Sequence, residues 1–376
     1  MNNADNSAKK ITGLAGPFQR RPAEQLYQHQ LELLKQQALG PVPAGWRLSP
    51  RAVEKFLLGD PALGIERKFV ADRAQVARII IGLCTSRGAM LVGEPGTAKS
   101  LLSELLAAAI SGDSTLSLQG AAISRVDQLL YGWNPSVLQQ QGYSRQALVP
   151  SPLLRGMMEG KLVRFEELAR CPQPLQDALL SVLSERVLVI PELAGDDSVI
   201  MARHGFNVIA TSNSVDEGLH KISAAMKRRM DFEEIRPIAR LPDELAVVMQ
   251  QAERHNREAG IVVELAEPVV AVLVTLFHEL RNGQTLDGRS TDRLADAALS
   301  TAEAVSVVHA ASLNAWYYGD GIVSIEHIMQ HLIGSALKDK ADDRRRLRHY
   351  FDTAIASRQG EHWQQLWALR SLIGPG

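Results

Sequence analysis

The sequence predicts an α/β domain with a parallel sheet covered by helices, followed by a smaller domain made only of helices. Three observations support this prediction. Strand-like apolar runs alternate with helical segments from Trp46 to about Ile235, a pattern typical of parallel sheets. A glycine-rich loop, GEPGTAKS at 93–100, joins one of these runs to a helix. Beyond Pro242 only helical patterns follow.

Length and composition set wide limits. The 376 residues are enough for two domains and a sizeable core. The 41 lysine and arginine residues nearly balance 42 aspartate and glutamate residues, so overall charge does not favour a nucleic-acid partner. Cys84 and Cys171 lie in unrelated contexts, which fits a reducing compartment. Without a signal peptide or an apolar stretch of membrane-spanning length, we expect a cytoplasmic protein.

The segments divide the chain as follows. Residues 1–45 form a polar N-terminal extension and linker, with a short helix at Pro22–Gln37. Residues 46–236 form the α/β domain, 237–340 the helical domain and 341–376 a charged helical tail. Expected strands are 89–92, 115–119, 162–165 and 206–211. Expected helices after the proline-containing break at 236–242 are 243–258, 267–281, 291–311, 324–338 and 341–357.

The loop at 93–100 nearly matches the phosphate-binding pattern G-x-x-x-x-G-K-[ST]. A strand that turns sharply into a helix directs several backbone N–H groups and the positive end of the helix dipole at one point, which therefore binds phosphate. Gly93 and Gly96 supply unusual backbone angles and close approach. Lys99 would reach the β- and γ-phosphates of ATP, and the Ser100 hydroxyl would bind Mg²⁺.

One residue departs from this pattern, because Ala98 stands where the second glycine belongs. We expect a near-helical backbone at Ala98, where alanine costs nothing. The other residues expected to contact the nucleotide are Glu94, Pro95, Thr97 and Leu101.

A pair of carboxylates follows the strand expected at 162–165, about seventy residues after the loop. Glu166 would help to hold Mg²⁺, and Glu167 would polarise the attacking water. Glu166 replaces the usual aspartate and is one methylene longer, so it would still reach the metal through water. Arg164 is a charge in a strand that should be buried on both faces. It either pairs with an acid or lies near the nucleotide.

Further along, the sequence resembles the MoxR family of AAA+ ATPases. The resemblance rests on the turn at 168–172, the helix QDALLSVL with Glu185-Arg186 after it, and the run FNVIATSN at 206–213. It extends from about Ile65 to Leu332. It implies an AAA+ core with a helical lid domain, and it places Asn213 as sensor 1, holding the attacking water or a γ-phosphate oxygen. A turn residue is the other interpretation of Asn213, but the preceding strand favours the sensor.

The resemblance also assigns two arginine roles. In the segment AAMKRRMDF, Arg229 takes the register of the arginine finger, with Arg228 as the second choice; by itself, a basic run would indicate a solvated face. In GRSTDRL, where a helix is expected to start, Arg293 is the expected sensor 2 and Arg289 the alternative.

Two insertions and the tail leave alternatives open. Tyr131-Gly132-Trp133 either packs on the core, which we favour, or forms an aromatic loop that grips a client. Residues 187–202 read as a hairpin. The tail DDRRRLRHYF, from 342 to 351, is read as a solvated helix, with a nucleic-acid or partner patch as the minority interpretation.

The family resemblance implies an ATP-hydrolysing, chaperone-like machine that needs ATP and Mg²⁺. It would assemble as a homo-oligomer, a hexamer, and remodel a protein client, in some relatives together with a von Willebrand factor A domain partner. Two other classes stay open. One is a nucleotide-gated scaffold with negligible turnover, because Ala98 and Glu166 depart from the pattern. The other is a nucleic-acid-directed motor, for which the basic tail is the only support.

Overall fold

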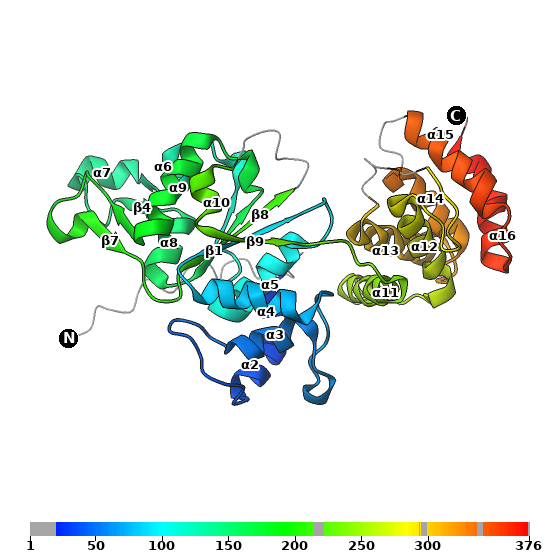
Figure 1. The fold of residues 1–376 in the computed structure, drawn as a ribbon, viewed down its shortest axis with the longest axis horizontal. Coiled ribbons are helices and arrows are strands. Elements are labelled where there is room, and N and C mark those ends of the chain that lie inside the picture. The colour runs from blue at the N-terminus through cyan, green and yellow to red at the C-terminus, as the bar shows by residue number, and fades with distance from the viewer. Residues whose placement is uncertain (1–19, 214–221, 293, 295–298, 337–340, 375–376) are drawn as a thin grey trace.

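The computed structural model describes residues 20–213, 222–292, 294, 299–336 and 341–374. They form an α/β domain and a helical lid domain, connected by the chain that leaves strand β9 (Figure 1). This is the fold class that the sequence predicted. Within the described residues, no helix is both long and apolar enough to cross a membrane.

The α/β domain is built on a parallel sheet of five strands in the order β2-β5-β8-β1-β9. The strands are β1 (Gly88–Gly93), β2 (Ser117–Gln119), β5 (Leu162–Glu166), β8 (Asn207–Asn213) and β9 (Met230–Glu234). The first four correspond to the predicted strands. The sequence analysis missed β9 because its sequence, MDFEE, carries three carboxylates. An edge strand tolerates this composition, since one side of it faces solvent.

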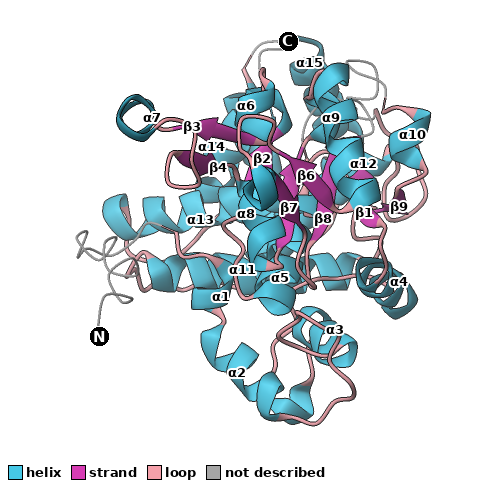
Figure 2. Cartoon of the chain, turned by 90° about the vertical axis from the view of Figure 1, so that its left-hand side faces the viewer, coloured by secondary structure: helices cyan, strands magenta, loops and turns pink. Residues whose placement is uncertain are grey.

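Successive residues of the central strands enter two different cores. Met90, Val163 and Val208 belong to one cluster, and Ala89, Leu91 and Ile209 to the other. This alternation follows from the two-residue period of a strand, and helices cover both faces of the sheet (Figure 2). The helices of this domain are α3 (Pro50–Leu58), α4 (Arg73–Cys84), α5 (Lys99–Ser111), α6 (Val126–Leu129), α7 (Pro135–Gln141), α8 (Pro152–Glu159), α9 (Gln173–Glu185) and α10 (Ala224–Lys227), with 3₁₀ turns at Pro61–Leu63, Gly120–Ala122, Leu168–Arg170 and Gly195–Ser198.

Two short helices, α1 (Ala23–Leu26) and α2 (Gln28–Gln36), occupy the segment where one helix was expected. Their apolar residues Leu31 and Leu34 are buried in the core that covers one face of the sheet. Tyr27, between the two helices, accepts a hydrogen bond from Arg254 of the lid domain. This segment therefore contacts both domains.

Two antiparallel hairpins stand apart from the main sheet. The predicted hairpin at 187–202 is present, as β6 (Val187–Val189) paired with β7 (Val199–Met201). The aromatic segment forms β3 (Tyr131–Trp133), which pairs with β4 (Leu148–Pro150). Tyr131 and Trp133 are half-buried against the core, with ring centroids 5.9 Å apart. This placement favours the packing interpretation over a free gripping loop.

The lid domain contains α11 (Leu241–Glu258), α12 (Glu267–Asn282), α13 (Thr301–Tyr318) and α14 (Ile325–Ala336), followed by α15 (Ala341–Tyr350) and α16 (Glu361–Ala368). Helix α13 was expected to begin at 291, but it begins ten residues later. The reason is a capping box, in which Ser300 Oγ accepts from the Glu303 N–H and the Glu303 carboxylate accepts from the Ser300 N–H.

The C-terminal segment from 341 packs into the lid core. Leu347, Tyr350 and Phe351 of this segment are fully buried in the same cluster as α12 and α13. A π-helical turn (Phe351–Ile355) and a 3₁₀ helix (Leu369–Ile373) continue the packing. The Tyr350 hydroxyl also donates to the buried carboxylate of Glu279 at 2.5 Å. The prediction of a solvated helix therefore holds for only one face of α15, because the other face is buried in the lid core.

Phe351→Ala tests this packing. Because Phe351 is fully buried, we expect the free energy of unfolding of the lid domain to fall by about 3–5 kcal/mol. Asp352→Ala, on the exposed neighbour, should change it by less than about 0.5 kcal/mol. Denaturant unfolding followed by tryptophan fluorescence measures both. Equal midpoints for the two variants would contradict a structural role for the C-terminal segment.

Candidate nucleotide-binding site

The candidate site lies at the carboxyl edge of the sheet, where β1, β5 and β8 end. Gly93 at the end of β1 lies opposite Asn213 at the end of β8. Glu166 is the last residue of β5. Ligands of open α/β sheets bind at this edge, because the strand-to-helix loops gather there.

The glycine-rich loop is packed tightly against its surroundings. A Cβ atom on Gly93 would lie 2.2 Å from the backbone oxygen of Ile235, just after β9. Gly96 has a φ of +78°, and a Cβ atom on it would lie 2.1 Å from Cβ of Ser300 in the lid domain. Glycine is therefore required at both positions. The loop contacts the interdomain connection at one point and the start of α13 at the other.

Ala98 does not have the backbone that the sequence analysis expected. Its φ of 62° and ψ of 26° place it in the left-handed region, and α5 begins only at the following residue. The expectation of a near-helical Ala98 is wrong, because this residue turns the chain into the helix rather than starting it. A left-handed alanine costs about 1–2 kcal/mol in backbone energy.

Lys99 is enclosed by the loop that precedes it. Its side chain is buried, and Nζ donates to the carbonyl oxygens of Gly93 at 3.0 Å and Glu94 at 2.6 Å. Nζ also lies 3.4 Å from the Thr97 hydroxyl. The cation is thus held on the inner side of the loop.

Glu166 connects the loop helix to two strands through its buried carboxylate. Oε2 accepts from the hydroxyls of Ser100 at 2.7 Å and Thr211 at 2.8 Å. Oε1 accepts from Ser103 at 2.6 Å and from Arg164 at 2.8 Å. Arg164 therefore pairs with an acid, which is one of the two alternatives that the sequence left open.

These contacts keep Glu166 ionised. Burial by itself would raise the pKa of this carboxyl group, but hydrogen bonds from Ser103 and Ser100, together with the charge of Arg164, outweigh that effect. The pKa of Glu166 is therefore below its usual value. A carboxylate that stays charged at neutral pH is suited to a cation beside Ser100.

Glu167 differs from Glu166 in both backbone and exposure. It is left-handed, with a φ of 56° and a ψ of 47°, and its N–H donates to the Thr211 hydroxyl at 3.0 Å. Its side chain is 37% exposed and lies 3.4 Å from Arg170. Left-handed non-glycine residues of this kind cluster at functional sites. One carboxylate of the pair is thus buried, and the other is accessible.

Arg229 lies at the opposite edge of the sheet. Its carbonyl oxygen accepts from the N–H of Gly88 at 3.0 Å, where β1 begins. The glycine-rich loop follows the other end of β1, about 16 Å away at the rise of a β-strand. The guanidinium donates to Ser184 and to the carbonyl oxygen of Ala225. Arg229 and its exposed neighbour Arg228 are therefore not brought into the site of their own chain.

Of the two candidates for sensor 2, only Arg289 lies within the described residues. Arg293 lies outside the described residues. Arg289 lies in the loop before α13, where it pairs with Asp287 at 2.9 Å and donates to Ser357 at 3.4 Å. Its side chain is thus directed into its own domain. The residue of α13 that meets the glycine-rich loop is the helix cap, Ser300.

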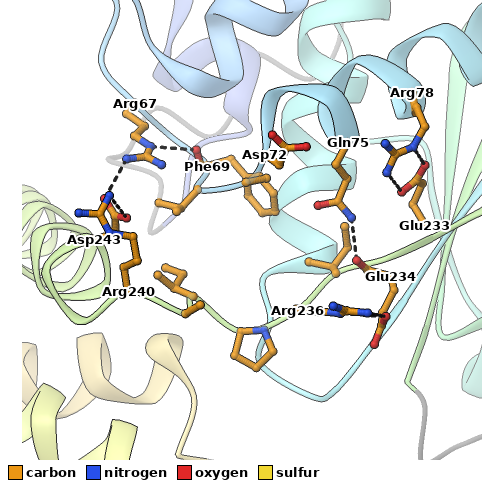
Figure 3. Close-up of a pocket in the computed structure, with 16 residues that line it drawn as sticks. Arg67, Phe69, Asp72, Gln75, Arg78, Glu233, Glu234, Arg236, Arg240 and Asp243 are labelled. Carbon is orange, nitrogen blue, oxygen red and sulfur yellow. Dashed lines mark hydrogen bonds and ion pairs between the residues drawn. The ribbon is translucent and has the colours of Figure 1, made fainter. Parts of the chain in front are cut away.

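A hollow of about 620 Å³ lies beside the chain that connects the two domains (Figure 3). It is lined by segments 67–78 and 233–243, with Phe69, Val70 and Pro237 among its apolar residues. Ile235 connects it to the site, since its N–H donates to the carbonyl oxygen of Val92 at 2.7 Å. The sequence analysis missed this hollow because its two walls are far apart in the chain. The proline break after β9 was the only local signal.

The two domains match two family descriptions. Residues 88–230 match the AAA domain of the dynein-related subfamily, and residues 242–374 match the C-terminal domain of YehL-like AAA+ ATPases. The YehL protein of Escherichia coli strain K12 is 46% identical over 354 residues, which cover 94% of this chain and 97% of that protein. The chain belongs to the YehL-like family of AAA+ ATPases.

A more distant relative and a solved structure also align with this chain. The gas vesicle ATPase GvpN2 of Halobacterium salinarum is 26% identical over 249 residues, covering 60% of this chain and 66% of that protein. The crystal structure of NtrX from Brucella abortus aligns with a TM-score of 0.48 and 12% identity, covering 81% of this chain and 63% of that one. The AAA+ part of the predicted resemblance is confirmed by the family matches.

Ala98→Gly tests the left-handed turn. Glycine removes the backbone cost of a left-handed alanine but loses more entropy on folding, so we expect a net gain of about 0.5–1 kcal/mol in the free energy of unfolding. Ala107→Gly, in the middle of α5, should instead lower it by about 1 kcal/mol or more. Denaturant midpoints of both variants check the opposite signs. A loss of stability in Ala98→Gly would contradict the observed backbone.

Proposed function

We propose that this chain binds ATP with Mg²⁺ and hydrolyses it to ADP and phosphate. The observation that carries the proposal is the hydrogen bond between Ser100 of the loop helix and Glu166 of β5, at 2.7 Å. It brings the phosphate loop and the acidic strand into contact at one edge of the sheet. Glu167 follows directly and is accessible.

The residues of this edge fit the ligands that the family implies. Backbone N–H groups at the start of α5 would bind phosphate oxygens, assisted by Lys99. Ser100 and the ionised Glu166 would hold Mg²⁺, which supplies charge neutralisation to the phosphates. The 620 Å³ hollow is lined by apolar residues, among them Phe69, Val70 and Ile235, together with charged ones. Its apolar part would accommodate the adenine base. Among the described residues, no group of three or more histidine, cysteine, aspartate or glutamate side chains could hold a metal ion by itself.

Glu167 would act as the general base. Its accessible carboxylate can accept a proton from water, whereas the buried oxygens of Glu166 are already hydrogen-bonded by Ser100, Ser103, Thr211 and Arg164. Arg170, at 3.4 Å, would restrict the orientation of the Glu167 carboxylate. Asn213 ends the strand beside β1, so its amide would orient the water as sensor 1.

The position of Arg229 supports a proposal of ring assembly. An arginine at the far edge of the sheet cannot complete the site of its own chain, but it can face the site of a neighbouring subunit. We therefore propose a homo-oligomer, a hexamer, in which Arg229 acts as the finger. We further propose Arg293 as sensor 2, with Arg289 as the alternative.

The work done by this ATPase is proposed from the MoxR-like resemblance. It would remodel or mature a protein client in the cytoplasm, with a von Willebrand factor A domain protein as a possible partner. The motor alternative has less support, because Arg345 and Arg346 of the basic tail pair with Asp342.

A nucleotide-gated scaffold stays as the second candidate. It is favoured by Ala98, whose left-handed backbone is maintained at an energetic cost and places a methyl group at the loop. A scaffold would bind ATP but release no phosphate above background.

Glu167→Gln separates the two candidates. The amide cannot accept the proton, so we expect ATP binding to remain while hydrolysis falls about 10²–10⁴-fold. Lys99→Ala should instead lose ATP binding, because the buried cation beside the phosphates is removed. Nucleotide titration and phosphate release measure the two properties. If the wild type releases no more phosphate than Lys99→Ala, the scaffold is the correct function.

Mixing two inactive variants tests the shared site. Arg229→Ala should lower turnover about 10³-fold or more, and Lys99→Ala should be inactive through lost binding. In a mixture, some interfaces combine an intact loop from the Arg229→Ala chain with an intact finger from the Lys99→Ala chain, so ATPase activity should partly return. A mixture that stays inactive although subunits exchange would argue against a finger acting between subunits. Full activity of Arg229→Ala alone would direct the search to Arg228.

A further inference from the structure

Arg164 is a charged residue in the middle of strand β5, directly behind the candidate metal-binding residues. Its side chain is only 13% exposed. All three guanidinium nitrogens have partners. Nε donates to Ser103 Oγ at 2.9 Å, one terminal nitrogen donates to the Ser114 carbonyl at 3.1 Å, and the other reaches Glu166 Oε1 at 2.8 Å and the Ser100 carbonyl at 3.2 Å. A planar guanidinium holds such partners in a fixed arrangement.

The two carboxylate oxygens of Glu166 have different hydrogen-bond partners. Oε1 is occupied by Arg164 and Ser103. Oε2 accepts from the hydroxyls of Ser100 and Thr211. Ser103 Oγ also lies 2.9 Å from the Ser100 carbonyl oxygen. Arg164 and Ser103 thus hold both the carboxylate and the first turn of α5.

We propose that Arg164 is a positioning residue for Mg²⁺ binding, which fixes Glu166 and Ser100 so that both can serve the same cation. This inference rests on the proposed function. A glutamate has one more rotatable bond than the usual aspartate, and its orientation must be fixed at an entropic cost. Arg164 and Ser103 supply this restriction from behind, without occupying the oxygen that faces Ser100.

The proposal can be separated from a purely electrostatic role. Arg164 is a permanent cation near the cation site, so its charge alone opposes Mg²⁺. If charge were its main effect, Arg164→Met would tighten Mg²⁺-dependent binding. If positioning is its main effect, the same variant weakens it. A role limited to folding would lower thermal stability and leave the effect of Mg²⁺ on nucleotide binding unchanged.

The experiment measures ATP affinity with Mg²⁺ and with EDTA, in the full chain carrying Glu167→Gln to slow turnover. In this background, Arg164→Met should reduce the Mg²⁺-dependent gain in affinity by about 10-fold or more, as expected when a residue that orients a metal ligand is removed. The affinity in EDTA should change by less than about 3-fold. Arg164→Lys should be intermediate, because lysine restores the charge but not the fork.

Arg155→Met is the matched control. Arg155 lies on α8, is 48% exposed and pairs with Glu159 at 3.5 Å, so its loss should leave the Mg²⁺-dependent gain unchanged. If Arg164→Met does not fold, Ser103→Ala decides, because it removes a partner of Glu166 with little change in volume. An unchanged or larger gain in the folded variant overturns the proposal. If Lys99→Ala also keeps full ATP affinity, the proposed function fails with it; if Lys99→Ala loses affinity, only the role of Arg164 fails.

Discussion

The site depends on the hydrogen bonds that the Glu166 carboxylate accepts. Its four hydrogen bonds come from α5, β5 and β8, so a single buried side chain connects the phosphate loop to the acidic strand and the strand of Asn213. Partners of a buried charge must all be present, because an unsatisfied carboxylate in the interior is costly. Together these partners outweigh the effect of burial and lower the pKa of Glu166. The position of each element at this edge is thereby linked to the others.

The lid domain contacts the glycine-rich loop, the hollow and the N-terminal helices. Ser300 at the start of α13 lies against Gly96. Arg67, which lines the hollow, pairs with Asp243 of α11 at 3.3 Å, and Tyr27 accepts from Arg254 of the same helix. Movement of the lid relative to the sheet would therefore alter the loop, the hollow and the N-terminal helices together.

Errors in the sequence analysis have specific causes. Strand β9 was missed because an edge strand carries polar residues on its open side. The start of α13 was placed too early because the Ser300–Glu303 capping box was overlooked, although it is visible as S-x-x-E. The backbone of Ala98 was misjudged because the left-handed region is rare for alanine. The burial of the C-terminal segment was hidden by its high charge, which occupies only one face of α15.

The sequence by itself determined the elements whose signal is local. The order of strands and helices, the phosphate loop and the two adjacent carboxylates all follow from periodicity and from short spacings. Only the tertiary structure decided which residues meet. Arg164 reaches Ser103 and Ser114 across separate elements, the walls of the hollow come from 67–78 and 233–243, and Arg229 lies one strand length away from the site of its own chain. The physical reason is that strand order and register set these distances, and no short window of sequence contains them.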